Sequence, residues 1–178
     1  DPHKVDAITS ILSFGSRVPI CEELDAFYKI YLPDGGFAYI DKQEIFDSCN
    51  RKSIINYAKL LQGVPYLWGG KSSFGYDCSG FVQMVLKVNR ILIERDASLQ
   101  LYTKGLAQVN INQAQPGDLI FFSNNNIINH VGFIIDGGKI IHCSGQVKIE
   151  SIMDGNSDFN EKLGNLSKTI MSISGLLD

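Results

Sequence analysis

The sequence of 178 residues contains no run of about 18 apolar residues, the length that a helix needs to span a membrane. It also lacks an excess of positive charge, since 16 lysines and arginines stand against 19 acidic residues and the formal net charge is −3. This balance argues against broad binding to phosphate backbones. Neither an internal repeat nor a low-complexity tract is visible. We therefore expect a folded, monomeric protein without a membrane span or a nucleic-acid partner.

Cysteine pairs with the spacing of a zinc ribbon are also missing. The four cysteines at positions 21, 49, 78 and 143 include no CxxC pair and match no small disulfide framework. A mixed metal site formed by Cys78, His130, His142 and Cys143 is one alternative, although its spacing is diagnostic of nothing. The chain also begins without a methionine or an apolar signal core, so an upstream segment is expected to be missing and secretion cannot be read from it.

The first 47 residues have the pattern of short strands. The runs RVPICEEL (17–24) and FYKIYLPDGGFAYID (27–41) predict strand, strand, hairpin turn and strand. Side chains alternate over 28–32 as in a half-buried strand, and Asp34-Gly35 is a strong turn signal. We predict a small barrel over residues 1–47. A sheet continuous with the following domain is the alternative.

From residue 48 onward the pattern is first helical and then strand-like. Apolar residues recur at helical spacing between Ile54 and Leu61, and a glycine-rich aromatic loop over 64–77 leads to a second helix that begins near Cys78. Asp96 is expected to cap a short third helix. Strand-like runs follow at 118–123, 130–136, 139–145 and 147–152. Helices followed by antiparallel strands predict an α+β domain over residues 48–178.

Cys78 lies between Asp77 and Ser79, where a glycine-containing loop becomes a helix. A structural cysteine would sit more naturally among the apolar residues that follow. A thiol becomes a strong nucleophile only as thiolate, and a helix N-terminus and a nearby imidazolium each lower its pKa. The position therefore predicts a reactive thiol.

An imidazole partner must come from three histidines, of which His3 lies near the N-terminus. His130 is expected to begin a strand after the polar loop 123–129, and His142 lies in the next strand. With Gly137 and Gly138 as the turn, ideal pairing places residue 133 opposite His142. The two histidines then point to opposite faces unless a bulge or a longer loop intervenes. A surface histidine and a core histidine are the alternatives to Cys–His catalysis.

Five motifs occur in order along the chain: PYLWGGKSSFGYDCSGFVQ (65–83), ERDASLQ (94–100), AQPGDLIFF (114–122), NHVGFIIDGGKIIHCSG (129–145) and IMSISGLL (170–177). Together they resemble the NlpC-type bacterial cell-wall cysteine peptidases, a papain-like superfamily, from about residue 54 onward. The N-terminal part resembles the bacterial SH3-like barrel that is often fused to this domain. The resemblance implies a papain-like catalytic domain over 48–178 behind an SH3-like barrel over 1–47.

The resemblance also implies a role for each site residue. Cys78 would be the nucleophile, His130 the general base and His142 the residue that orients the base, with both histidines lining the cleft. No metal or organic cofactor is required. The implied substrate-binding residues are Asp77 and Ser79 on the polar side of the cleft, Tyr66 near the reacting carbonyl, Trp68 as a wall and Arg95 facing a substrate carboxylate.

Some of these roles have structural alternatives. Loop packing could explain Tyr66 and Trp68, and a salt bridge to an acid could explain Arg95. In related two-domain enzymes the barrel borders the cleft, where an acid and a tyrosine recognise a free peptide N-terminus, and Tyr39 is the matching tyrosine. Ser16 stands where a glutamate is expected, so either Glu22 or Glu23 replaces it or the selection for a free amine is relaxed.

The function implied is a peptidoglycan hydrolase that acts on stem peptides. It would cleave the bond between γ-D-glutamyl and a diamino acid, expected to be meso-diaminopimelate, with preference for a free N-terminal L-Ala. An amidase or acyltransferase on the same scaffold and a non-catalytic cell-wall-binding module are the alternatives. Whether intact wall or released muropeptides are the substrate stays open, and so does the compartment, cell envelope or cytoplasm.

Overall fold

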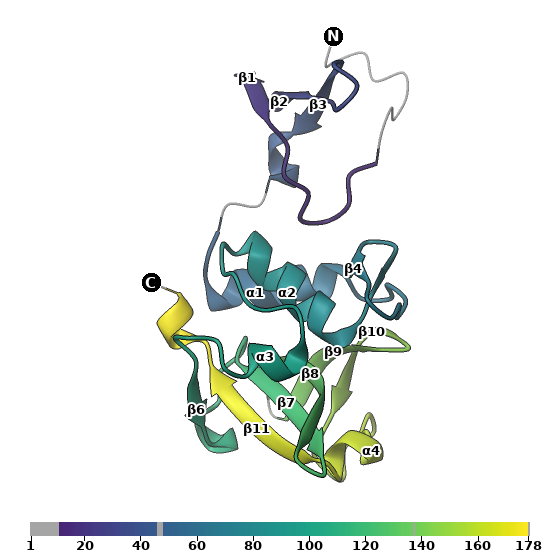
Figure 1. Cartoon of the computed structure of the whole chain (residues 1–178), viewed down its shortest axis with the longest axis vertical. Coiled ribbons are helices and arrows are strands. Elements are labelled where there is room, and N and C mark those ends of the chain that lie inside the picture. The colour runs from purple at the N-terminus through teal and green to yellow at the C-terminus, as the bar shows by residue number, and fades with distance from the viewer. Residues whose placement is uncertain (1–10, 46–47, 137, 178) are drawn as a thin grey trace. The chain divides into compact units, whose positions relative to one another are not determined.

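The computed structural model describes residues 11–45, 48–136 and 138–177, and the chain divides into two compact units, Asp1–Asp47 and Ser48–Asp178 (Figure 1). The N-terminal unit contains a three-stranded antiparallel meander of β1 (Ile20–Glu23), β2 (Phe27–Tyr31) and β3 (Phe37–Asp41), followed by the 3-10 helix η1 (Lys42–Glu44). The three strands and their Asp-Gly turn confirm the pattern read from the sequence. The SH3-like barrel stays a prediction, and His3 lies outside the described residues.

The second unit begins with its helices. They are α1 (Arg51–Leu60), α2 (Cys78–Val88), α3 (Ala97–Gln100) and, later in the chain, α4 (Glu161–Gly164), with 3-10 turns η2 (Ile111–Gln113) and η3 (Ser174–Leu176). Asp96 takes the N-cap position of α3 as expected, but its side chain makes no capping hydrogen bond. In the described ranges, no helix combines the length and the apolar character that crossing a membrane requires.

A six-stranded antiparallel sheet forms the rest of this unit, in the order β10-β9-β8-β7-β11-β6. The strands are β6 (Ala107–Val109), β7 (Leu119–Asn124), β8 (Ile127–Asp136), β9 (Lys139–Ser144), β10 (Gln146–Ser151) and β11 (Ser167–Ser172), and a short pair, β4 (Lys71–Ser72) and β5 (Gly75–Tyr76), precedes α2. The α+β class and the meander from β7 to β10 are confirmed, whereas β6 and β11 were not predicted.

His130 does not begin its strand, contrary to the sequence-based expectation. β8 starts three residues earlier, at Ile127, because Asn125 and Asn126 both adopt positive φ, 48° and 62°. Two successive left-handed residues make a tight hairpin turn, and asparagine tolerates this conformation better than most residues. The polar loop is thus much shorter than expected, and His130 lies inside the strand.

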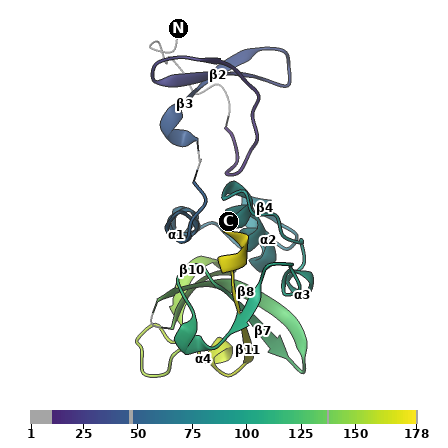
Figure 2. The ribbon, with the colours of Figure 1, turned by 90° about the vertical axis from the view of Figure 1, so that its left-hand side faces the viewer.

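The sheet is apolar on both faces. On one face the ring of Phe81 from α2 lies 5.8 Å from that of Phe133. The other face carries a buried cluster made of Ile120, Phe122, Ile134, Ile140, Ile152, Leu163 and Ile170. Figure 2 shows α1 and α2 at one side of this unit and α4 at the opposite side, where Leu163 of α4 joins the cluster.

A buried ion pair joins α1 to the adjacent ends of β7 and β11. The guanidinium of Arg51 donates to Asp118 at 2.7 Å and also reaches the hydroxyl groups of Ser172 and Ser174. Asp118 is 1% exposed and accepts further hydrogen bonds from the backbone of Gln115 and Ile173. Because both oxygens of this carboxylate accept hydrogen bonds and one of them pairs with Arg51, its charge is compensated in the interior.

We expect Asp118→Ala to lower the free energy of unfolding of the second unit by about 3–5 kcal/mol, since it leaves Arg51 and two backbone N–H groups without their acceptor. Urea unfolding followed by circular dichroism measures the change. Lys139→Ala is the matched control, because its ion pair with Asp158 is largely exposed and should contribute no more than about 1 kcal/mol. Equal losses for the two variants would contradict the role given to Asp118.

Candidate active site

Cys78 is the first residue of α2, and Asp77 fixes the start of that helix. The Asp77 carboxylate accepts the N–H of Gly80 at 2.7 Å and, from the preceding loop, the N–H of Gly69 at 2.9 Å. Position 80 must be glycine, because the carbonyl of Gly70 occupies the place that a Cβ would take. This close approach holds the aromatic loop against the first turn, beside a half-buried Cys78.

The two histidines share one face of the sheet because β8 contains a bulge. Asp136 pairs with Lys139, but the next pair is Ile134 with Ile140, so Ile135 is the extra residue. Pairing continues with Gly132 opposite His142, which puts His130 two positions along the same face. A bulge is one of the two conditions under which the sequence allowed the histidines to meet.

Gly132 makes room for the ring of His142. A Cβ built on Gly132 would lie 2.8 Å from Cβ of His142 and 2.9 Å from the carbonyl oxygen of Ile141. Any side chain there would force β8 and β9 apart. The glycine in the HVG sequence is therefore needed for the packing of the two histidines.

Nε2 of His130 lies 2.7 Å from Nδ1 of His142, and Nε2 of His142 lies 2.8 Å from the carboxylate of Glu150. This row of three side chains crosses β8, β9 and β10. Glu150 was not identified from the sequence. The Ser144-Gly145 turn could have pointed to it. A tight hairpin there pairs Lys148 with His142 and places Glu150 diagonally across from the His142 ring.

Both imidazoles are neutral near neutral pH. Burial lowers the pKa of His130 to about 3, and the neighbouring His142 acts in the same direction. Burial also lowers the pKa of His142, although the hydrogen bond to Glu150 opposes the shift. The ring of Phe122, 5.8 Å from that of His130, belongs to the apolar cluster that excludes water from this end of the sheet.

The charge state of Cys78 differs from the expected thiolate. Burial raises the pKa of its thiol, and the negative charge of Asp77 adds to this effect, while backbone N–H groups of Val131, Ser79 and Cys78 itself act to lower it. The helix start and the hydrogen bond from Val131 thus help the thiolate, but they do not outweigh burial. At neutral pH these shifts leave Cys78 as a thiol and His130 as a neutral imidazole.

Arg95 forms a salt bridge, which was the structural alternative for this residue. Its guanidinium contacts both oxygens of Asp77, at 2.9 and 2.5 Å, and donates to the hydroxyl of Ser79 at 2.8 Å. Burial acts to raise the pKa of Asp77, but hydrogen bonds from Arg95 and Gly80 leave it below its usual value. The partner is Asp77 rather than the adjacent Asp96, so three of the residues expected to bind substrate form one polar cluster.

The aromatic residues expected at the site differ in their surroundings. Burial raises the pKa of Tyr66, and the negative charges of ionised Cys78 and Asp77 raise it further. The Tyr66 hydroxyl thus lies within electrostatic reach of Cys78. Trp68 is 87% exposed. Tyr39 is 41% exposed on β3 of the N-terminal unit.

The acids considered as replacements for the missing glutamate already have partners. Glu22 pairs with Lys29 at 3.3 Å and Glu23 with Lys42 at 2.7 Å. Ser16 donates its backbone N–H to the carbonyl of Ser13. The contribution of these residues to substrate recognition therefore stays a prediction.

The sequence places this chain among known proteins. Residues 63–161 match the family described as NlpC/P60. The chain belongs to the NlpC/P60 family. It is 34% identical over 142 residues to a Bacillus cereus (strain ATCC 10987 / NRS 248) protein named gamma-D-glutamyl-L-lysine dipeptidyl-peptidase. The aligned residues cover 74% of this chain and 42% of that protein. A Bacillus subtilis (strain 168) protein of the same name is 33% identical over 158 residues, 85% of this chain and 52% of that protein.

Solved structures of NlpC/P60 proteins have the same fold. That of a family member from Bacillus cereus ATCC 10987 matches with a TM-score of 0.72 at 28% identity, over 86% of this chain and 53% of that chain. The NlpC/p60 domain of the peptidoglycan hydrolase SagA matches with a TM-score of 0.56 at 29% identity, over 68% of this chain and 97% of that domain. The family resemblance read from the five motifs is thus confirmed. The chain spans about half the length of the curated relatives it matches.

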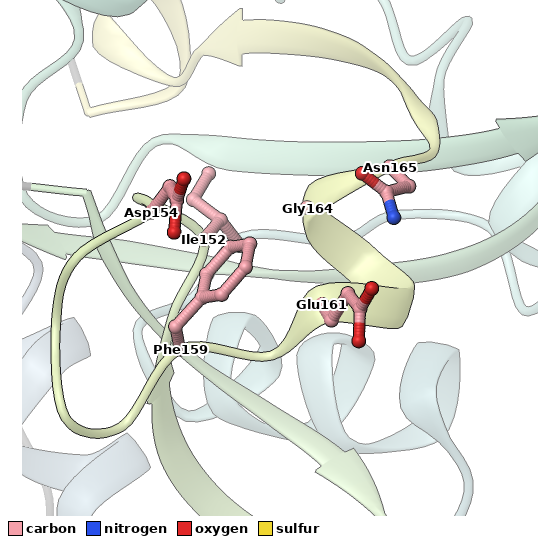
Figure 3. Close-up of a pocket in the computed structure, with 6 residues that line it drawn as sticks. All are labelled: Ile152, Asp154, Phe159, Glu161, Gly164 and Asn165. Atoms are coloured by element: carbon pink, nitrogen blue, oxygen red, sulfur yellow. The ribbon is translucent and has the colours of Figure 1, made fainter.

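Two further features concern the metal-site alternative and a pocket elsewhere in the same unit. In the part of the chain that the structure describes, no three Cys, His, Asp or Glu residues are grouped to hold a metal ion. A pocket of about 510 Å³, shown in Figure 3, is lined by Ile152, Asp154, Phe159, Glu161, Gly164 and Asn165. Among the described residues its lining includes neither Cys78 nor a histidine. It belongs to the segment that covers the apolar cluster.

We expect alkylation of Cys78 by iodoacetamide to be slow at neutral pH and to accelerate as pH rises, with a midpoint above the ordinary thiol value of about 8.5. The sign follows from burial, because a raised pKa keeps the thiol protonated until the solution is more alkaline. Peptide mapping after timed labelling from about pH 6 to about pH 10 measures the rate. The exposed Cys49 is the internal reference.

Cys143 should stay unlabelled over this range, because burial raises the pKa of its thiol to about 12 and its Sγ donates to the carbonyl of Tyr76. A labelling midpoint for Cys78 well below about 8 would instead indicate a resting thiolate–imidazolium pair. It would contradict the neutral pair described above.

Proposed function

We propose that this chain is a peptidoglycan hydrolase, a cysteine endopeptidase that cleaves the γ-D-glutamyl–diamino acid bond of stem peptides. The observation that carries the proposal is the contact between Nε2 of His130 and Nδ1 of His142. The residue after His130, Val131, donates its backbone N–H to the sulfur of Cys78. Because the contact between the two rings occupies Nε2 of His130, its Nδ1 is the nitrogen available to the thiol. A thiol, a base and an orienting group are the parts that nucleophilic catalysis needs.

The reaction begins with transfer of the thiol proton to Nδ1 of His130 as Sγ of Cys78 attacks the γ-glutamyl carbonyl carbon. Backbone N–H groups at the start of α2, those of Cys78 and Ser79, support the negative charge on the carbonyl oxygen. The imidazolium of His130 then gives its proton to the leaving amine. Water, activated by the same nitrogen, hydrolyses the acyl-enzyme and regenerates the thiol.

The polar cluster of Asp77, Ser79 and Arg95 supports recognition of a charged peptide end. Arg95 uses three N–H contacts on Asp77 and Ser79, and an arginine has five N–H groups in all. The remaining two can meet a carboxylate of the stem peptide. The two Bacillus relatives are named for a γ-D-glutamyl-L-lysine bond, which supports γ-D-glutamyl as the acyl group. The diamino acid that we propose is meso-diaminopimelate, with L-lysine as the competing choice.

We expect the intact protein to hydrolyse L-Ala-γ-D-Glu-meso-diaminopimelate to L-Ala-D-Glu and the free diamino acid, and Cys78→Ser to reduce kcat/KM by at least about 10³-fold. Mass spectrometry of the products, with the L-lysine peptide in parallel, measures both the bond and the diamino acid. Cys49→Ser makes the same chemical change at an exposed thiol outside the site and should keep full activity.

The product identifies the reaction class. Cleavage at another bond would show a different amidase, and transfer to an added amine would show an acyltransferase. Binding without cleavage by a correctly folded protein would show a cell-wall-binding module and contradict the proposal. If Cys78→Ser kept full activity, another nucleophile would have to be sought.

We also propose a preference for stem peptides whose L-Ala amine is free, with Tyr39 contributing to recognition. A charge-assisted hydrogen bond to an ammonium group contributes about 1.5–3 kcal/mol, or about one to two orders of magnitude in selectivity. We therefore expect N-acetylation of the peptide to lower kcat/KM by about that factor, and Tyr39→Ala to reduce the difference. Tyr31→Ala, which removes an exposed tyrosine on the neighbouring strand, is the control. Equal rates on free and acetylated peptides would exclude the preference.

A further inference from the structure

Glu150 ends the row of side chains that starts at His130, and its carboxylate has three donors around it. Oε2 accepts from Asn160 Nδ2 at 2.8 Å and lies 2.8 Å from Nε2 of His142, while Oε1 pairs with Lys148 at 2.9 Å. Hydrogen bonds from Lys148, Asn160 and His142 hold the pKa of Glu150 below its usual value against the effect of burial. The group is therefore an ionised carboxylate that can only accept.

The orientation of Asn160 is fixed independently. Asn160 caps α4, and its Oδ1 accepts the backbone N–H of Leu163 at 3.0 Å. A backbone N–H is always a donor, so the oxygen of this amide must face Leu163 and its NH₂ group must face Glu150. The segment that lines the pocket in Figure 3 thus holds Asn160 as a donor to the carboxylate.

The acceptor role of Glu150 determines which ring nitrogens of His142 and His130 carry a hydrogen. Since Glu150 only accepts, Nε2 of His142 must carry a hydrogen, and the neutral ring then has a bare Nδ1. That bare nitrogen accepts from His130, so Nε2 of His130 carries its hydrogen and Nδ1 of His130 is unprotonated. The opposite arrangement would place a hydrogen on Nδ1 of His130, where it could not receive the proton of the thiol.

We propose that Glu150 is a positioning residue that sets the proton positions on His142 and His130, so that His130 presents an unprotonated Nδ1 to Cys78. The inference rests on the proposed function in one respect only, the use of Cys78 as nucleophile. It also explains why an ionised carboxylate lies at the far end of a pair of neutral rings. When His130 takes the thiol proton, the positive ring donates from Nε2 towards His142, and the carboxylate supports that charge through His142.

Other charged residues near His130 and His142 do not set these proton positions. Lys148 on β10 and Lys162 on α4 both act to lower the pKa of His130, so they oppose a positive charge on its ring. Asp77 is the N-cap residue of α2, directly before Cys78, and its carboxylate is bound to Arg95. Among the described residues, Glu150 is the acid whose carboxylate contacts His142.

The test is the tautomeric state of each histidine, read from two-bond ¹H–¹⁵N correlation spectra of the ¹⁵N-labelled protein at neutral pH. We expect both His130 and His142 of the unmodified protein to carry the proton on Nε2. This measurement needs no variant and no substrate, so it stands even if the protein hydrolyses no stem peptide. A proton on Nδ1 of either ring would overturn the proposal.

Variants then test whether Glu150 causes the arrangement. Glu150→Leu removes the acceptor and keeps water out, so we expect a mixture of tautomers at His142 and a loss in kcat/KM of about 10- to 100-fold, part of the effect of a well-placed base. Glu150→Gln keeps one acceptor oxygen and should restore the Nε2-protonated form and most of the activity. Asp158→Asn removes a carboxylate paired with Lys139 in the same segment and should change neither readout.

A purely structural role predicts something different. In that case Glu150→Leu and Glu150→Gln would lower the thermal midpoint without changing the tautomer populations. Unchanged populations in a folded Glu150→Leu variant would overturn the proposal. If this variant does not fold, Glu150→Gln is compared with the unmodified protein, and the Nδ1-protonated form in Glu150→Gln would equally contradict rescue by a remaining acceptor.

Discussion

A single extra residue in β8, Ile135, sets the face of the sheet on which His130 lies relative to β9. Without it the pairing would move by one residue, and since side chains alternate along a strand, His130 would point away from His142. The hydrogen bond between the two rings therefore depends on a backbone irregularity several residues away. Gly132 completes the arrangement, because its missing side chain leaves space for His142. The contact between the two imidazoles follows from these two positions.

The site combines two neutral rings, of which His142 is buried and His130 half-buried, with one ionised carboxylate. Burial makes a charge on either imidazole unfavourable, and the ring of Phe122 lies beside that of His130. Burial of Cys78 raises the pKa of its thiol. At rest, neither the thiol nor the two imidazoles carry a charge. In the proposed reaction, charge develops on the thiol and the imidazole only when the proton moves from sulfur to nitrogen during attack. The groups proposed to stabilise it, the N–H groups of α2 and Glu150, are already in place.

Features with local causes could be predicted from the sequence. Asp77 and the following small residues mark a helix start, so the place of Cys78 could be read directly, and the Asp34-Gly35 turn located the first hairpin. The Ile135 bulge could be named only as a condition, because register depends on how β8 and β9 pack in three dimensions. Glu150 was missed since its contact with His142 is diagonal across a hairpin. The expected thiolate of Cys78 took no account of burial, which raises the pKa of this thiol and is a tertiary property.

The order of strands has a consequence for how the chain is made. β11, although last in sequence, occupies an inner position between β7 and β6, and Arg51 needs Ser172 and Ser174 as partners. During synthesis on the ribosome, β7 must therefore expose an unpaired edge until residues 167–172 emerge, although Cys78, His130 and His142 have been translated long before. Contacts so distant in sequence form slowly, and an open edge invites pairing with other chains. The nascent catalytic unit is thus most prone to aggregate shortly before its last strand appears.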